Sequence, residues 1–204
     1  MSLSDRYKKL RKRIYALKRA MLPARFDPTG TYREAVHDRA LGFRVLACAE
    51  MEAFFEDRVQ SAVRQAARNW NDSRVASKVL TAVNAFVHVG TETPPVEYNT
   101  KDNLKKRVNL SIARFEHRLK DNHGIRRHHT VPLLSMVGIE EDEIDELWIS
   151  NLDNFAQLRG QTAHTSRYDR VNVRIDPKTE WNSVIQLVES AKQFDKRISD
   201  LGGI

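Results

Sequence analysis

The chain has 204 residues, of which 41% are hydrophobic and 30% are charged, with only 8 glycines and 6 prolines. This composition is typical of a globular helical protein and argues against a β-sandwich or a disordered chain. No run of about 18 uncharged apolar residues occurs, so the sequence predicts no membrane span. The single cysteine, Cys48, excludes an internal disulfide framework and a cysteine-based zinc site.

The net charge of the chain is +7 at pH 7. Such basicity favours partners that carry phosphate, because lysines and arginines gain affinity when they displace the counterions of a polyanion. The alternative is that the charge serves solubility alone. Residues 1–13 are basic and no apolar segment follows them, so we expect no secretory signal and a cytosolic location.

The first expected element is a basic amphipathic helix over residues 6–25, which hold nine lysines and arginines and no acid. Its apolar residues are three and four positions apart: Tyr7, Leu10, Ile14, Leu17 and Met21. Pro23, Pro28 and Gly30 follow, and we therefore divide the chain into a basic N-terminal arm, 1–30, and a helical domain, 31–204. The apolar face lacks the large aromatic content of a membrane-surface helix, so we expect the arm to dock on the domain or on RNA.

A long helix is predicted from Thr31 to about Trp70. Thr31 and Glu34 have the spacing of a capping box, and no glycine or proline follows Gly42 in this segment. One acid, Glu52, lies in the middle of the apolar stripe. The other members of the stripe are Val45, Cys48, Phe55, Val59, Ala62 and Ala66.

Further helical patterns fill most of the remaining chain. They cover about residues 73–89, 100–119, 131–138, 144–159 and 176–198, with Thr100 as an N-cap and a basic loop before the third of them. Asp176 and Pro177 have the chemistry of an N-cap and a first helical residue. We therefore predict an all-α bundle of about five to seven helices, with the basic N-terminal helix in addition.

The middle of the chain raises the question of a metal site, because it holds four histidines: His117, His123, His128 and His129. No cysteine or carboxylate accompanies them at the spacing of zinc or iron ligands. Arg126 and Arg127 in the same loop would also repel a cation. We predict no metal and no cofactor, and we expect this basic loop to touch phosphate or solvent.

The common catalytic signatures are absent from the sequence, including GxxxxGK[ST], GxGxxG and GxSxG. Cys48 lies between Ala47 and Ala49 on the stripe of the long helix. A small buried residue is expected there, since a nucleophilic cysteine needs exposure and a positive environment.

The heptapeptide LRGQTAH, residues 158–164, differs from the other helical segments. Arg159 follows Phe155 by four residues and Leu152 by seven, so it lies on the apolar stripe of its helix. A buried guanidinium must be paired, and Glu52 is the natural partner. In the alternative interpretation, Arg159 and His164 are ordinary cations that the helix dipole favours at a C-terminus.

His164 lies five residues after Arg159, which is a rotation of roughly 140° on an ideal helix. The two side chains therefore diverge unless the helix distorts or ends near Gly160. Two antiparallel copies about a two-fold axis could place both pairs in one cleft, so this geometry suggests a homodimer.

The arrangement resembles the HEPN superfamily, and most closely its RiboL-PSP-HEPN-like branch. The signature of the family is an arginine, four to six arbitrary residues and a histidine on a late helix of an α-bundle, here Arg159 and His164. Ala163 before the histidine matches the usual ending. AEMEAFFEDRV, residues 49–59, is similar to the family's early helix, with Glu52 as its glutamate.

The resemblance implies a metal-independent endoribonuclease that acts as a homodimer in toxin–antitoxin or anti-phage systems. RNA supplies its own nucleophile, the 2′-OH, and the products would be a 2′,3′-cyclic phosphate and a 5′-OH. His164 would be the general acid or base and Arg159 the phosphate clamp. Glu52 would orient Arg159, and Gln161 would make a supporting contact.

The basic segments would follow the RNA backbone in this interpretation. They are represented by Lys12 and Arg13 in the N-terminal arm and by Arg126 and Arg127 in the central loop. An antitoxin or another defence-system protein is a further expected partner, and no membrane is expected.

One position departs from the family pattern. The residue after the arginine is commonly Asn, Asp or His, whereas this chain has Gly160. Gln161 could take over the polar role, or the site could be weakened. The alternative function is therefore a catalytically inactive HEPN-like module that binds RNA or a protein. A DNA-binding regulator is a third possibility, but no helix-turn-helix spacing supports it.

Overall fold

The computed structural model describes residues 3–88, 103–164 and 174–202. The described elements are α1 (Asp5–Met21), α2 (Glu34–Ser73), α3 (Lys78–His88), α4 (Asn103–Lys120), α5 (Arg127–Ser135), the 3₁₀ turn η1 (Glu141–Glu143), α6 (Glu146–His164), α7 (Pro177–Ser190) and α8 (Lys192–Gly202). The predicted all-α class is confirmed. None of the described helices combines the length and the apolar character that crossing a membrane requires.

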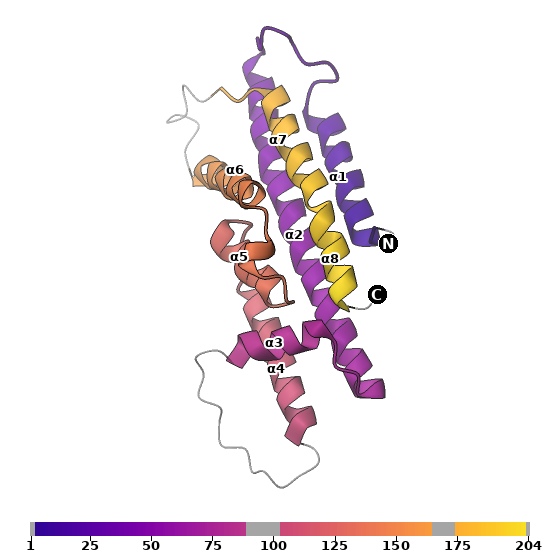
Figure 1. The fold of residues 1–204 in the computed structure, drawn as a ribbon. Coiled ribbons are helices and arrows are strands. Elements are labelled where there is room, and N and C mark those ends of the chain that lie inside the picture. Colours follow the sequence, from indigo (N-terminus) through magenta and orange to yellow (C-terminus); the bar gives the residue numbers. More distant parts are fainter. Residues whose placement is uncertain (1–2, 89–102, 165–173, 203–204) are drawn as a thin grey trace.

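The 40-residue helix α2 is the axis of the fold. It contacts every other described α-helix. Figure 1 shows α1, α7 and α8 running alongside it, while α5 and α6 cover a different side and α3 and α4 lie toward its C-terminal end. The largest apolar side chains that α2 buries are Phe43, Met51, Phe54 and Phe55. A helix that is covered along most of its length buries more than one stripe.

The basic N-terminal helix packs into the bundle. Its apolar face, Tyr7, Leu10, Ile14 and Leu17, is buried against α2 and α7. The Tyr7 hydroxyl donates a hydrogen bond to the Val188 carbonyl in α7 at 3.2 Å, and burial raises the pKa of this phenol to about 12. The arm is therefore docked on the helical domain, which is one of the two expected alternatives; the other was docking on RNA. The division of the chain at residue 30 stays a prediction.

Two buried ion pairs tie α2 to the C-terminal helices. Arg44 binds Glu180 of α7 through two hydrogen bonds, of 2.9 Å and 2.5 Å. Arg58 binds Asp195 of α8, with 2.7 Å between Nε and Oδ1. The same carboxylate accepts hydrogen bonds from the backbone and hydroxyl of Ser4, the N-cap of α1. One network therefore joins α1, α2 and α8.

Helix α5 begins earlier than the sequence predicts, at Arg127 and not near residue 131. Its N-cap residue, Arg126, makes no capping hydrogen bond with its side chain. Asp153 of α6 takes over this function, because its carboxylate accepts from the Arg127 backbone N–H at 2.8 Å and pairs with the Arg126 guanidinium at 3.2 Å. A cap supplied by another helix leaves no local sequence signal.

Other helix ends follow the sequence to different degrees. The predicted start of the last helix is confirmed, with Asp176 as N-cap and Pro177 in the first turn. That segment divides into α7 and α8 at Ala191, where a single helix was predicted. The predicted capping box at Thr31 is wrong, because α2 begins at Glu34 after Arg33, which makes no side-chain cap. Thr100 lies outside the described residues.

Candidate functional site

The predicted motif lies in the C-terminal part of α6. The helix continues through Gly160 to His164, so the positions of Arg159 and His164 lie about 140° apart around an ideal helix axis. The side chains of residues 161–164 lie outside the described part of the structure, and these include the predicted site residues Gln161 and His164. The described side of the site is therefore built around Arg159.

Gly160 leaves open space beside Arg159. A Cβ atom at Gly160 would meet no atom of the described residues within 4 Å. Both the backbone and the space at this position therefore accept a larger residue.

We expect Gly160→Ala to raise the free energy of unfolding by about 0.5–1 kcal/mol, because glycine inside a helix costs backbone entropy. Urea denaturation measures this change. The matched control is Gly42→Ala in α2, where the added Cβ would lie 2.7 Å from the Met21 Cε, so this methyl group must shift and a smaller gain is expected. A loss of stability in Gly160→Ala would mean that this face of α6 is covered.

The Arg159 charge acts on Cys48 of α2. Arg159 is partly buried, and its Nε is buried without a hydrogen-bond partner among the described residues. Burial raises the pKa of the Cys48 thiol to about 12, while the charges of Arg159 and Arg44 act in the opposite direction. Cys48 is thus a buried, protonated thiol, as predicted, and Arg159 lies in its electrostatic neighbourhood.

The expected ion pair between Arg159 and Glu52 is not formed: the salt bridges of the described residues do not join the two side chains. Glu52 is only partly buried, so solvent can stabilise its charge without an ion-pair partner. It nevertheless lies in the same neighbourhood, because its charge also acts on the Cys48 thiol. The buried cations of α2 pair instead with carboxylates of α7 and α8.

Glu52 also acts on His129 of α5, a histidine that the sequence analysis assigned to a basic loop in contact with phosphate or solvent. Burial lowers the pKa of His129, the neighbouring His128 lowers it further, and the negative charge of Glu52 opposes this. One turn along α2, burial raises the pKa of Glu56, whose carboxylate accepts a 2.8 Å hydrogen bond from Asn122. We call Glu52, Glu56 and His129 the acid–base cluster.

In the acid–base cluster the charge of Glu52 acts on both the His129 imidazole and the Glu56 carboxyl. The lowered pKa of His129 keeps it unprotonated at neutral pH, and the raised pKa of Glu56 brings this carboxyl closer to the range of proton transfer. No local pattern predicts this convergence, because it depends on α5 being capped by Asp153 of α6.

The shifted pKa of His129 predicts a pH dependence of stability. The groups that act on this ring are His128, Glu52, Arg126 and His123. Because folding lowers the pKa of His129 below 6.5, the stability that depends on its neutral form is full above that value. It is lost as the pH falls through 6.5 and then through the lower pKa of the folded state.

We expect the melting temperature of the wild type to fall more than that of His129→Asn between about pH 7.5 and about pH 5.5. The raised pKa of Glu56 acts in the opposite sense, and the comparison with the variant isolates the histidine. His117→Asn, at an exposed histidine paired with Asp121, is the control. Equal losses in wild type and His129→Asn would contradict the expected linkage.

The model of the RiboL-PSP-HEPN family matches residues 5–199. The chain belongs to this family, a branch of the HEPN superfamily. No curated protein and no solved structure matches the chain.

The match of this HEPN-family chain extends from the first residue of α1 to the last turns of α8. It therefore includes the basic helix α1 as well as Arg159, His164 and Glu52. Among the described residues, no group of three or more histidines, cysteines and acids is arranged to hold a metal ion.

The predicted RNA-contacting cations of the HEPN-family chain are mostly engaged within the protein. Arg126 pairs with Asp153, and Arg13 pairs with Glu50 at 2.8 Å. Two acids, Glu141 and Glu146, bind Arg127 and raise the pKa of its guanidinium. Lys12 is exposed on α1. Contact with RNA through the three arginines would compete with these ion pairs, so their RNA-binding role stays a prediction.

Proposed function

We propose that this HEPN-family protein is a metal-independent endoribonuclease of the toxin or anti-phage defence type, which cleaves RNA at a composite site formed by two copies. The single observation that carries the proposal is Arg159. It fits the arginine of the motif that the sequence resemblance implies and lies within the matched range, and its buried Nε has no hydrogen-bond partner among the described residues. A buried, unpaired donor on a cation is costly and is suited to receive an anionic oxygen.

The proposed reaction needs no nucleophile from the protein. The 2′-oxygen of a ribose attacks the adjacent phosphorus and loses its proton, and the bond from phosphorus to the 5′-oxygen breaks as that oxygen gains a proton. One imidazole can take the first proton as a base and then give a proton to the 5′-oxygen as an acid. His164 of one copy would serve as this base and acid, in a cleft that also holds Arg159 of the other copy.

Arg159 would bind the non-bridging oxygens of the phosphate through two N–H groups and stabilise the charge that grows on them. Glu52, which acts on the Cys48 thiol together with Arg159 and also acts on His129, would favour the cationic form of a nearby imidazole. Gln161 would make a supporting contact. An antitoxin or another defence-system protein and a cytosolic location belong to the same proposal.

The deciding experiment is cleavage of a mixed RNA pool by purified protein in EDTA, with Arg159→Ala and His164→Ala alongside. The control variants are Arg39→Ala, at an exposed arginine of α2, and His117→Ala, at an exposed histidine of α4. We expect cleavage by the wild type and both controls and loss of cleavage in both motif variants.

The second candidate is an inactive module that binds RNA or a protein. Gly160 favours it, because the polar residue that commonly follows the motif arginine is missing and the space for it is open. RNA binding without cleavage in the wild type, and its persistence in His164→Ala, would support this module and contradict the nuclease. Gly160→Asn would then show whether the missing polar residue accounts for the inactivity.

A further inference from the structure

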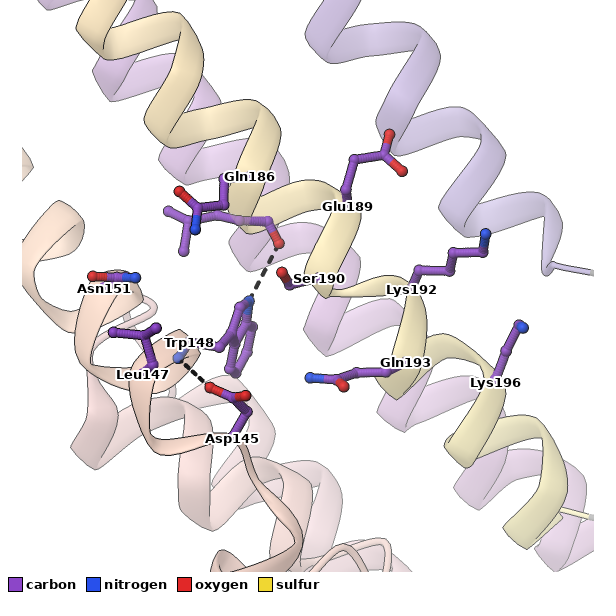
Figure 2. Close-up of a pocket in the computed structure, with 11 residues that line it drawn as sticks. Asp145, Leu147, Trp148, Asn151, Gln186, Glu189, Ser190, Lys192, Gln193 and Lys196 are labelled. Carbon is purple, nitrogen blue, oxygen red and sulfur yellow. Dashed lines mark hydrogen bonds between the residues drawn. The ribbon is translucent and has the colours of Figure 1, made fainter.

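A surface pocket of about 460 Å³ lies where the start of α6 meets the junction of α7 and α8. We call it the α6–α8 groove. Figure 2 shows its lining, which comes from residues 145–151 on one side and 186–196 on the other. Its volume is within the range of small-molecule sites. It lies toward the opposite end of α6 from Arg159, and nothing in the proposed reaction uses it.

The floor of the groove is preformed. The indole N–H of Trp148 donates to the Leu187 carbonyl at 3.2 Å, and the Trp148 backbone N–H donates to the Asp145 carboxylate at 2.7 Å. The indole packs on Phe194, with 4.3 Å between ring centroids, and on Phe55 in the core. A ligand would therefore meet a rigid floor, and ordering entropy would oppose binding only through the exposed side chains around it.

The groove gathers polar groups that the fold itself does not use. Three amides, of Asn151, Gln186 and Gln193, make no side-chain hydrogen bond to the described residues, and Lys192 and Lys196 have no ion pair there. These two ammonium groups contrast with Arg13, Arg126 and Arg127, which are all paired.

The carboxylates of the groove are already engaged. Glu189 pairs with Arg11 of α1 at 2.9 Å, and Asp145 accepts the hydrogen bond from the Trp148 backbone. Their charges are partly compensated before any ligand arrives, the first by a guanidinium and the second by the N-terminus of α6. The groove therefore offers two free cations to an anion.

The free groups are sorted in space. Figure 2 shows Gln186, Gln193 and Asn151 extending on the side of α6, whereas Lys192 and Lys196 extend from the other side of α8. Leu147 lies beside Asn151 and Trp148. It is 69% exposed, which makes it the most exposed large apolar residue among those described. The groove thus combines an apolar rim and amide groups on one side with positive charge on the other.

We propose that the α6–α8 groove binds a nucleotide unit, with its phosphate on Lys192 and Lys196 and its base between Leu147 and the amides of Asn151, Gln186 and Gln193. Amides pair with the donor and acceptor edges of bases, and lysines attract phosphate as point charges. The favoured source is RNA, in which case the inference rests on the proposed function. Asn151 and Arg159 are eight residues apart on α6, about 12 Å along the axis, so a short single strand could reach both.

The test is a titration of a short fluorescein-labelled single-stranded RNA of mixed sequence, followed by anisotropy between about 50 and about 200 mM salt. We compare the wild type with the double variant Lys192→Gln and Lys196→Gln. The matched control is the double variant Lys105→Gln and Lys106→Gln, two exposed lysines of α4, a helix that does not line the groove. Every protein in this titration also carries His164→Ala, so that the proposed nuclease does not cleave the RNA. EDTA inhibits contaminating nucleases that depend on metal ions.

We expect loss of the two groove lysines to reduce the slope of log affinity against log salt by about 1.4, which corresponds to two single-strand phosphate contacts. The control should keep the wild-type slope. Gln193→Leu should weaken binding without changing the slope, since it removes an amide and no charge. An unchanged slope in the groove variant, or an equal fall in the control, would overturn the inference.

A second measurement separates the two sources of nucleotide. Calorimetry with adenosine monophosphate should give binding heat that depends on Lys192 and Lys196 if the groove takes free nucleotides. If the groove variant changes the salt slope of RNA binding but adenosine monophosphate gives no binding heat, the groove binds an RNA strand and not a free nucleotide. The readout is binding, so it is independent of cleavage: a protein that binds RNA through the groove but does not cut it retains this site and loses the proposed nuclease function.

Discussion

Asp195→Ala should lower the free energy of unfolding by about 3–5 kcal/mol, the largest effect on stability that we expect from a single substitution. Asp195 is fully buried and pairs with Arg58, which is 4% exposed. Its removal leaves a buried guanidinium whose carboxylate partner is gone. It also removes the acceptor for the Ser4 backbone and hydroxyl and so loosens the start of α1. Urea denaturation followed by circular dichroism measures the change.

The control is Asp200→Ala, at an exposed aspartate of the same helix, which should change stability by less than about 0.5 kcal/mol. A double variant, Arg58→Met with Asp195→Leu, should recover most of the loss, because a buried ion pair can often be replaced by apolar residues of similar volume. A cost below about 1 kcal/mol for Asp195→Ala would show that water reaches Arg58 and that the network is not sealed.

The helical class and most helix cores could be predicted from the sequence, because the spacing of apolar residues reports directly which face of a helix is buried. The start of α7 was also predictable, since Asp176 and Pro177 supply its cap and first turn within the local sequence. The start of α5 was not. Its cap is Asp153, a residue 26 positions away that becomes a neighbour only when α6 folds back.

The charge pairs show the same limit. The sequence contains one acid on the predicted stripe of α2 and one arginine on the stripe of α6, and pairing them was economical. The fold instead buries Arg44 and Arg58, which are not in the predicted stripe, and gives them partners 136 and 137 residues away. Because α2 is covered by helices on several sides, a single amphipathic stripe underestimates what it buries.

Of the candidate site, only the residues of the Arg159–His164 motif and Glu52 could be predicted from the sequence. Arg159 could be selected because a charged residue on an apolar stripe needs an explanation, and the family resemblance supplied one. His129 could not be identified as a site residue from the sequence, because its pKa depends on the charge of Glu52 and on the orientation of α5. Histidines in a basic segment of the sequence look alike until the fold places one of them against a carboxylate.

Arg159→Ala and His164→Ala should each lower the rate of RNA cleavage by about 10²–10³-fold or more, the largest effects on activity that we expect. Arg159→Lys should recover little of the activity, because a lysine cannot hold two phosphate oxygens with two parallel N–H groups. Combining the two alanine substitutions should cost little more than the worse single one, since residues that act in one transition state do not contribute additively. Single-turnover cleavage of a labelled RNA measures each rate.

The composite site makes a sharper claim than the loss of activity alone. If the two copies share one cleft, a dimer formed by mixing Arg159→Ala with His164→Ala retains one motif arginine and one motif histidine in that cleft. Refolding the two inactive variants together should therefore restore measurable cleavage, whereas each refolded separately stays inactive. Wild-type protein refolded in the same way gives the highest activity that refolding can recover. Mass measurement of the mixture shows whether mixed dimers form. If mixed dimers form and cleave nothing, the shared cleft is wrong, because sites complete within one copy cannot be rescued by the other.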